Sequence, residues 1–509
     1  MIAVLQFDAA SGACLDRLIS AGRLPALGAL LDRGPRIGLD CDATPDFPAA
    51  TYPTLYSGCE LDDHGHYYPF QWVAGEQRLH CADTQPATPP EAVWERLAVA
   101  GKRSLVIDPY ECLPPRREVG VCMSGWQLAE RVVLPRWSRP RMARHRLALR
   151  HGRPADVTEV FGAPRTQDLL RLRERLAVAP GRAADATVQL MAGEPFDLVW
   201  VNFAAAHLGG HRLWDLSALH ETPEKAERDL LESGLDELYE ATDAAIDRVV
   251  TALPPQCDLL IVSPVGMAAN TSRADLLPGM LAAVLGEHPR EPGDEPETDA
   301  GASGWIWKLR GAAPVRLRTA MAAAVPAPLT RRLTARLELR GMDWNRTAAF
   351  AHPADNQGYV RLNLRGRERD GVVGVDEAEG LLERVADGLA TFADIDGGPA
   401  VAEVARVNRR SSDQSSGSLP DLVVRWSAGA TSRLQGVRSP RFGTVARQGG
   451  GSGRSGNHDS SSAWAIVVPG TGHRVAEAVD RRLVDIVPTI AVASGVDPAA
   501  LSGESLITC

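Results

Sequence analysis

The chain opens with MIAVLQFDAASG, residues 1–12, in which an apolar run leads to a carboxylate and then to small residues. Such a run is typical of a buried parallel strand, because a strand covered on both faces has no polar side. We therefore predict a strand over residues 2–7, with Asp8 just past its end. Similar short apolar runs recur at residues 104–108, 197–203, 258–263 and 462–469.

Helical patterns separate these strands, notably over residues 15–31 and 224–253. Strands that alternate with helices predict an α/β fold, in which helices cover both faces of a mostly parallel sheet. Functional side chains in such folds collect beyond the carboxyl ends of the strands. Asp8, His207 and Pro264 all follow predicted strands, so this edge of the sheet is where we expect the functional site.

Length and composition limit the classes of function. The chain has 509 residues, of which 44% are hydrophobic and 23% are charged, as is typical of a folded globular protein. At roughly 150 residues per domain, this length allows about one to three domains. The net charge of −9 argues against a nucleic-acid polymer as partner, but it is compatible with a small anionic substrate held by local positive groups.

The sequence also predicts a location. The sequence has no run of about 18 apolar residues, so no membrane-spanning helix is predicted. The first residues also lack the pattern of a secretory signal. The eight cysteines are scattered without a C-x-x-C pair. Free thiols and a cytoplasmic location are therefore expected, and the oligomeric state is left open.

Three segments are interpreted as cap-like insertions, over residues of about 62–95, 123–185 and 285–345. The second contains eight arginines between Arg131 and Arg153. This run predicts a solvated helix face, and a surface that attracts an anionic partner is the alternative. A glycine-rich loop over residues 449–456 is interpreted as either a lid or a surface connector.

Two residues in the first segments are suited to cation and anion chemistry. Asp8 is placed to bind a cation at the end of the first strand, and helix capping is the alternative. Thr51 stands before an apolar helical stretch, where backbone N–H groups would favour an anion and so a hydroxyl nucleophile. An N-cap threonine is the alternative interpretation for this residue.

Histidines provide the second group of candidates. His207 and His211 stand four residues apart just after a predicted strand, a spacing that lets two imidazoles face one cation. A third imidazole from His458 would complete the open three-ligand shell of a catalytic zinc site. Spacing alone does not choose His458 over the other candidates, which are His64, His66, His220, His352 and His473.

In order and content, these segments resemble the alkaline phosphatase superfamily, most closely its type I phosphodiesterase/nucleotide pyrophosphatase branch. The resemblance covers nearly the whole chain and implies one α/β domain over residues 1–509, with a mostly parallel central sheet between helices. The resembling motifs include FDAASGACLDRLISAGRLPALGALLDRG (residues 7–34), TPDFPAATYPTLYSGCELDDHGHYYP (44–69), FDLVWVNFAAAHLGGHRLWD (196–215) and SGNHDSSSAWAIVVPG (455–470).

The resemblance also implies roles for single residues. Asp8 matches a metal ligand, and Thr51 matches the residue that serves as both nucleophile and ligand. His207, His211 and His458 match the ligands of the other metal ion, although the family has Asp where this chain has His207. These matches imply a small phosphoryl-type anion as the substrate.

One departure from the family changes the expected chemistry. The family has Ser-Asp-His-Gly-Met after the strand near residue 260, where this chain has Ser263-Pro264-Val265-Gly266-Met267. Neither Pro264 nor Val265 has a side chain that binds a metal ion, so this second metal site is degraded. We therefore expect one divalent ion, zinc, and treat a second as doubtful.

Two functions remain open at this stage. The first is a hydrolase or transferase of phosphoryl or sulfuryl esters, with Thr51 as the nucleophile or as a positioning group. The alternative is a non-hydrolytic or repurposed family member, either a pseudoenzyme or a specialised biosynthetic enzyme, that binds an anionic ligand. A positive charge could replace the lost ion, and the candidates in the family-like segment are Arg361, Arg365 and Arg367.

Overall fold

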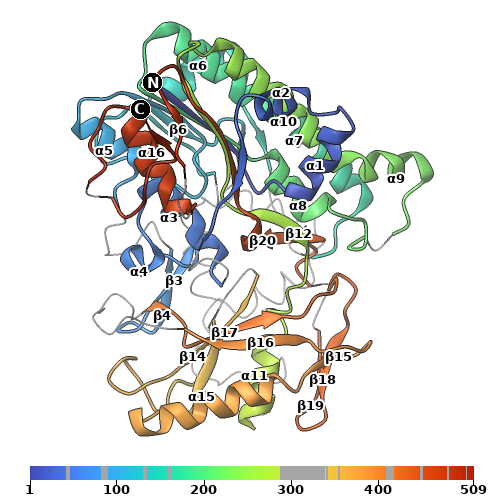
Figure 1. Cartoon of the computed structure of the whole chain (residues 1–509). Coiled ribbons are helices and arrows are strands. Elements are labelled where there is room, and N and C mark those ends of the chain that lie inside the picture. The colour runs from blue at the N-terminus through green and yellow to red at the C-terminus, as the bar shows by residue number, and fades with distance from the viewer. Residues whose placement is uncertain are drawn as a thin grey trace.

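The structure is a computed structural model, and most of the chain is described. The described residues are 1–41, 46–81, 90–129, 134–157, 162–219, 221–286, 339, 342–352, 356–407, 418–447, 451–477, 481–499 and 501–508. Figure 1 shows a larger lobe built on a sheet between helices and a smaller lobe with a sheet of its own.

The larger lobe contains a sheet of eight described strands in the order β2-β21-β11-β1-β10-β5-β6-β8. β21 and β8 run antiparallel to their neighbours, and the other pairings among β11, β1, β10, β5 and β6 are parallel. The predicted α/β class with a mostly parallel sheet is therefore confirmed. The strands are β1 (Ile2–Phe7), β2 (Arg36–Gly38), β5 (Ser104–Ile107), β6 (Gly120–Ser124), β8 (Trp137–Arg139), β10 (Leu198–Phe203), β11 (Asp258–Ser263) and β21 (Trp464–Val468).

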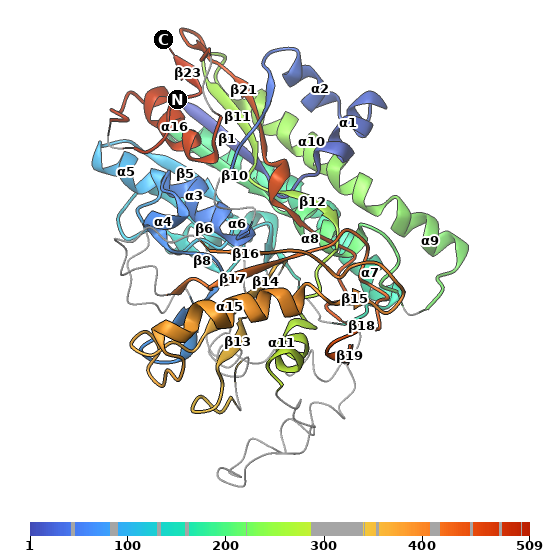
Figure 2. The same cartoon turned by 60° about the horizontal axis from the view of Figure 1, so that its bottom comes forward.

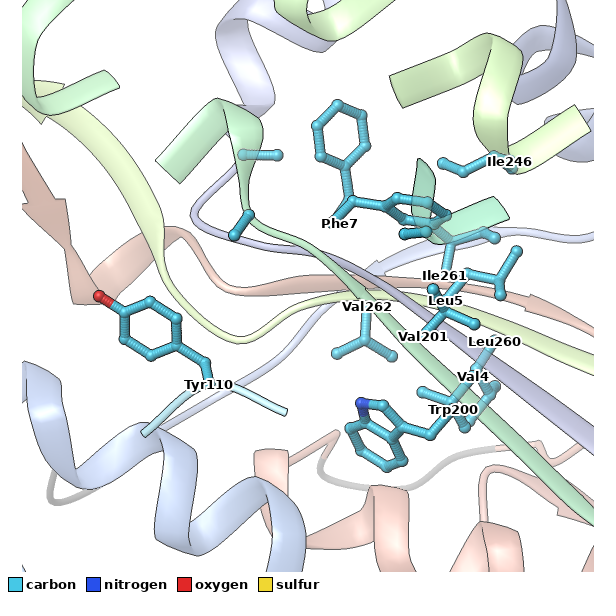
Figure 3. Packing of buried hydrophobic residues seen from close by; sticks show 14 of the residues in the cluster. Val4, Leu5, Phe7, Tyr110, Trp200, Val201, Ile246, Leu260, Ile261 and Val262 are labelled. Carbon is cyan, nitrogen blue, oxygen red and sulfur yellow. The ribbon is translucent and has the colours of Figure 1, made fainter. Parts of the chain in front are cut away.

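The centre of the sheet is the core of this lobe. β1 lies between β10 and β11, and every residue of these three strands is buried. Figure 3 shows their apolar side chains packed together, including Val4, Trp200 and Leu260. Strands buried on both faces favour continuous apolar runs, which is why the sequence pattern identified them. Because all three run in the same direction, their carboxyl ends lie at one edge.

Helices cover both faces of the sheet, as Figures 1 and 2 show. On one face α10 packs against its neighbours, and on the other α16 packs against two helices. The first group is α1 (Gly12–Ser20), α2 (Pro25–Leu31), α7 (Thr166–Gly193), α8 (Ala205–Leu213), α9 (Lys225–Glu232) and α10 (Gly234–Ala252). The second group is α3 (Thr51–Ser57), α5 (Val93–Val99) and α16 (Ile486–Ala493).

Both helices predicted as continuous are interrupted. The stretch predicted as a helix over residues 15–31 forms α1 and α2, because Gly22 adopts a left-handed φ of 70° and Pro25 begins the second helix. The stretch over residues 224–253 forms α9 and α10, which meet at Ser233. The spacing of apolar residues does not reveal such a break, because the helices on both sides of it bury an apolar face.

The smaller lobe has a second hydrophobic core, formed by buried residues between Leu276 and Val437. Its four-stranded sheet has the order β13-β14-β17-β16. The elements are α11 (Leu277–Leu285), β13 (Ala349–His352), β14 (Gly358–Leu362), α15 (Val375–Leu389), β16 (Val401–Arg406) and β17 (Leu422–Trp426). Figure 1 shows this sheet with α11 and α15 beside it.

The three predicted insertions are distributed over both lobes. Residues 62–95 include the hairpin β3 (Phe70–Val73) and β4 (Arg78–Cys81), where Trp72 packs against Phe350 of the smaller lobe. Residues 123–185 include edge strand β8, α6 (Ala143–His151) and most of α7. Arg131 and nearly all of residues 285–345, including the acidic loop 287–299, lie outside the described residues. The division into one domain with caps stays a prediction.

Two further expectations concern the whole chain. Within the described ranges, no helix combines the length and the apolar character needed to cross a membrane. Six cysteines with described side chains are free, namely Cys14, Cys41, Cys59, Cys112, Cys122 and Cys257.

A pair of short strands joins the edge of the main sheet to the C-terminal part of the chain. β12 (Gly266–Ala269) pairs antiparallel with β20 (Gly456–Asp459), so that Met267 lies opposite His458. At Gly456 the backbone approaches α8 closely, since a Cβ atom there would lie 2.2 Å from the Gly210 carbonyl oxygen. Only glycine therefore lets β20 pack against α8 at this distance.

We predict that Gly456→Ala lowers the free energy of unfolding by about 1–3 kcal/mol, because the methyl group would push β20 away from α8. The matched control is Gly380→Ala in α15, where an added Cβ meets nothing within 4 Å. The control should be neutral or up to about 1 kcal/mol more stable. Chemical denaturation measures both, and equal stability of the two variants would contradict the close packing of α8 and β20.

Candidate metal centre

Three histidines from two distant parts of the chain meet at the carboxyl edge of the main sheet. His207 and His211 lie on α8, which begins two residues after β10 ends. His458 lies on β20, which β12 holds beside the end of β11. One ring nitrogen from each histidine lies within 4.8 Å of the others, and these three residues form the only such group of His, Cys, Asp or Glu found in the described part of the chain.

The three imidazoles form a compact triangle. Their ring centroids are separated by 5.0 Å for His207 and His211, 4.7 Å for His207 and His458, and 4.8 Å for His211 and His458. His207 Nε2 lies 2.8 Å from His458 Nε2. His207 and His211 are buried, and His458 is partly exposed. Substrate-sized molecules would therefore approach the group from the side of His458.

The second nitrogen of two of these rings is already engaged. His211 Nδ1 lies 3.1 Å from the Gly456 carbonyl oxygen. A carbonyl oxygen only accepts, so Nδ1 carries the proton and Nε2 presents a lone pair. His207 Nδ1 lies 2.8 Å from Asp8 Oδ2, and the hydrogen bond between them orients the ring. Both rings thus have Nδ1 engaged and leave Nε2 available to a ligand.

The protonation state also suits metal binding. Burial lowers the pKa of His211 and of His458 well below the usual value, and the positive charge of Arg454 lowers both further. These two imidazoles are neutral at pH 7, which is the form that binds a metal ion. Three imidazoles whose ring nitrogens converge fit a zinc-like divalent ion, whose bonds to imidazole nitrogen are about 2.0–2.1 Å long.

Asp8 lies behind His207 and is fully buried. Its Oδ1 accepts hydrogen bonds from Gln6 Nε2 at 3.0 Å and from the Tyr52 hydroxyl at 3.2 Å, and its Oδ2 accepts one from His207. Three donors therefore stabilise the buried negative charge without a cation. The assignment of Asp8 as a metal ligand stays a prediction, and these contacts give it a second candidate role, which is to orient His207.

Thr51 is fully buried at the start of α3, directly after the short helix η1 (Pro48–Ala50). Its hydroxyl donates to the Pro48 carbonyl oxygen at 2.7 Å, and Ala50 holds the N-cap position. The next residue, Tyr52, is the one that contacts both Asp8 and His207. The nucleophile role of Thr51 stays a prediction.

The degraded positions are apolar and buried in the structure. Pro264 and Val265 connect β11 to β12, and the Val265 side chain has no exposed surface. The Ser263 hydroxyl donates to the Val265 carbonyl oxygen at 2.9 Å and accepts from the Ala10 amide at 2.9 Å. This loop is therefore fixed against the segment that follows Asp8, although it supplies no ligand side chain.

Sequence reasoning missed three residues of the site. Tyr52 contacts Asp8, the hydroxyl of Tyr110 lies 3.1 Å from His207 Nε2, and the charge of Arg454 acts on His211 and His458. Tyr110 follows the end of β5, so the rule that functional groups follow strand ends could have identified it. Arg454 lies in the glycine-rich loop four residues before His458, and nothing in its local sequence marks it.

The other sequence candidates lie away from the three-histidine group. His64 lies 3.0 Å from the Thr54 hydroxyl, the Tyr67 hydroxyl contacts His352, and His473 is paired with Asp258. The ring of His66 is tilted by 44° to that of His64, with the centroids 6.3 Å apart, and His220 lies outside the described residues.

The arginines considered as replacement charges lie in the smaller lobe. Arg361 is fully buried and ion-paired with Glu368, and Arg367 is paired with Glu368 and Asp421. Arg365 is exposed. Because Arg361 and Arg367 neutralise carboxylates of their own lobe, Arg454 is the arginine that the structure brings to the histidines.

Comparison with known proteins identifies the fold. No protein-family model matches the chain, and no curated protein sequence matches it. Among solved structures, the alkaline phosphatase PafA is 12% identical, covering 99% of this chain and 98% of its own, with a TM-score of 0.50. Phosphonoacetate hydrolase from Sinorhizobium meliloti 1021, in complex with phosphonoformate, is 12% identical over 97% of this chain and 95% of its own, with a TM-score of 0.46.

A third structure is murine ectonucleotide pyrophosphatase/phosphodiesterase 5 in complex with AMP. It is 10% identical over 99% of this chain and 97% of its own, with a TM-score of 0.48. At these identities the likeness concerns the fold. The chain has the α/β fold of the alkaline phosphatase PafA, in agreement with the fold that the resemblance of its motifs implies.

The hydrogen bonds of Asp8 generate a stability prediction. Asp8→Ala, measured in the presence of a chelator, should lower the free energy of unfolding by roughly 3–5 kcal/mol, because three buried donors lose their acceptor. The control is Asp156→Ala, whose carboxylate is 74% exposed and ion-paired with Arg136. It should change the free energy of unfolding by less than about 0.5 kcal/mol. If Asp8→Ala also changed the free energy of unfolding by less than about 0.5 kcal/mol, this result would refute the hydrogen-bond network around Asp8.

Proposed function

We propose that this chain, built on the alkaline phosphatase fold, is a hydrolase or transferase of phosphoryl or sulfuryl esters that uses a single divalent ion. His207, His211 and His458 would hold the ion, and Thr51 would be the nucleophile. The substrate would be a small anion, as the motifs of the sequence imply.

The observation that carries the proposal is the convergence of three imidazoles, with the second nitrogen of two of them held by Asp8 and Gly456. A ligand set of this kind leaves a coordination position open, which is the arrangement of catalytic rather than structural zinc sites. When bound, the ion would polarise an oxygen of the ester and stabilise the negative charge that develops on it.

Asp8 would act in this site as the residue that orients His207. A carboxylate that accepts from the far nitrogen of a ligating histidine fixes the ring and increases its basicity. This role uses the contact at 2.8 Å between Asp8 Oδ2 and His207 Nδ1. It also explains how a buried carboxylate persists beside a second metal position that has lost two ligands.

Arg454 supports the proposal because it brings a positive charge to the same place. The residue is only 8% exposed, and its charge acts on two of the three histidines. Its loop is fixed to α8, since the Ser455 amide donates to the His211 carbonyl oxygen at 2.9 Å. A fixed guanidinium would bind a phosphoryl oxygen and partly compensate for the lost second ion.

Thr51 would complete the reaction. In this scheme the Thr51 oxygen forms a bond to phosphorus as the bond to the leaving alcohol breaks, and water then hydrolyses the threonine ester. In the alternative, water attacks directly and Thr51 only positions the substrate. Its neighbour Tyr52 contacts Asp8 and His207, which supports a position of Thr51 close to the site.

The first prediction of this proposal concerns metal content. Elemental analysis of the purified protein should find about one zinc-like ion per chain, and His211→Ala should lose it. The control is His473→Ala, which removes a histidine that is paired with Asp258 outside the site. It should keep the ion.

Two results would contradict the one-ion proposal. Two tightly bound ions per chain would show that Asp8 and Thr51 hold a second ion after all. The absence of metal, even after incubation with zinc or manganese, would show that the three imidazoles do not act as a ligand set.

The second prediction concerns turnover of a chromogenic phosphodiester, bis(4-nitrophenyl) phosphate. Thr51→Ala should reduce kcat by at least about 10²-fold to 10³-fold, and Thr51→Ser should keep activity within about tenfold, because serine retains the hydroxyl. Thr489→Ala in α16, whose hydroxyl bonds to the Asp485 carbonyl oxygen, serves as the control. A small effect of Thr51→Ala would support direct attack by water.

A non-hydrolytic or repurposed protein is the second candidate, and a specific observation favours it. Asp8 accepts from three donors, and Pro264 and Val265 are buried, which supports a second metal position that no longer binds an ion. Phosphate binding without turnover would support this candidate. The double substitution Pro264→Asp with Val265→His should then fail to raise phosphodiesterase activity, whereas simple decay of the site predicts a gain.

A further inference from the structure

We propose that Tyr110 is a catalytic residue of this site, whose hydroxyl donates a hydrogen bond to an oxygen of the anion bound at the three-histidine group. The inference rests on the proposed function and adds to it a residue that replaces part of the lost positive charge. It is carried by the position of the phenol relative to His207 and by the rigidity of the loop that holds it.

The loop that follows β5 is held firmly. Asp108 adopts a left-handed φ of 54°, and its carboxylate accepts from the amides of Trp126 at 2.8 Å and Gln127 at 2.7 Å. The Asn202 side chain donates to the Asp108 carbonyl oxygen at 2.9 Å. The Tyr110 amide donates to the Tyr56 hydroxyl at 2.8 Å. These bonds fix the backbone of Tyr110 against β10 and α3.

The ring of Tyr110 is fixed as well. It is 4% exposed, its centroid lies 4.5 Å from that of His207 with an interplanar angle of 29°, and it lies 4.4 Å from the ring of Tyr52. Figure 3 shows its hydroxyl directed away from the apolar side chains of β1 and β11. A catalytic donor must be held by packing in this way, because a mobile group would have to be ordered during the reaction.

The hydroxyl points to the nitrogen that faces the centre of the triangle. It lies 3.1 Å from His207 Nε2, and His458 Nε2 lies 2.8 Å from the same atom. The bond of His207 Nδ1 to Asp8 leaves Nε2 available to a metal ion. With an ion on this nitrogen, the phenol would be placed to donate to an oxygen of an anion at the open position.

The two tyrosines of the site have different acceptors. The Tyr52 hydroxyl donates to Asp8 Oδ1 at 3.2 Å, so its hydrogen bond is directed to that carboxylate. The Tyr110 hydroxyl faces the histidine group, where a donor stabilises negative charge on a transferring oxygen. Removing one such donor typically slows an enzyme by about 10²-fold to 10³-fold.

The test is Tyr110→Phe, which removes the hydroxyl and keeps the ring contacts with His207 and Tyr52. The control is Tyr67→Phe, a buried tyrosine whose hydroxyl contacts His352 Nε2 at 2.9 Å, away from the three-histidine group. Three quantities are measured: zinc affinity by competition with a chelator, affinity of the zinc-loaded protein for inorganic phosphate by calorimetry, and thermal stability. Zinc affinity should stay within about threefold for both variants.

Phosphate affinity should fall about 10-fold to 100-fold for Tyr110→Phe and stay unchanged for the control, because a hydrogen bond to a charged oxygen is lost. Equal phosphate affinity in wild type and Tyr110→Phe would overturn the proposal and show that the phenol is structural. A tenfold or larger loss of zinc affinity would also overturn it, because Tyr110 would then be a metal ligand. Failure of the unmodified protein to bind zinc would instead refute the proposed function, and this role with it.

Discussion

A buried hydrogen bond between Asp8 and His207, 2.8 Å long, determines how the rest of the site is arranged. It joins the residue that follows β1 to the helix that follows β10, and neither side chain has any exposed surface. A buried carboxylate is costly unless donors surround it, and a buried imidazole is useful to a metal ion only if its tautomer is fixed. One contact satisfies both requirements and turns His207 Nε2 toward His211 and His458.

The surroundings of Asp8 show what stabilises this carboxylate in the structure. It accepts from Gln6 and Tyr52, and the loop at Pro264 and Val265, where the resemblance implies the ligands of a second ion, is apolar. Neutral donors neither activate a nucleophile nor bind a phosphoryl oxygen as a second ion would. In our proposal Arg454 and Tyr110 bind the phosphoryl oxygen in place of that ion.

Both lobes contribute to the site, which is why its parts are spread over the whole chain. Asn356 of the smaller lobe donates to the His458 carbonyl oxygen at 2.8 Å, and Tyr359 holds the Asp46 carbonyl oxygen just before the Thr51 helix. The smaller lobe thus fixes both the third histidine and the proposed nucleophile segment. Sites that lie between two packed units commonly combine a rigid ligand set with a wall that selects the substrate.

The sequence by itself determined the strand pattern, the α/β class and the order of the candidate histidines. These features are local, because a strand buried on both faces must be a continuous apolar run and a ligand must be a residue of suitable type. The resemblance of its motifs also marked Pro264 and Val265 as positions without a metal ligand, since neither side chain has a donor atom. Local patterns did not register the helix breaks at Gly22 and Ser233, because both halves bury a face.

Only the tertiary structure decided what each residue touches. It grouped His458, and none of the other candidate histidines, with His207 and His211 in the described part of the chain, and it paired Asp8 with His207. It also brought Tyr52, Tyr110 and Arg454 to the same edge of the main sheet. It also placed Arg361 and Arg367 in ion pairs of the smaller lobe. The physical reason is that these contacts depend on distances of a few ångströms between segments that lie hundreds of residues apart in the chain. Strand register and packing set these distances, and residue identity alone does not.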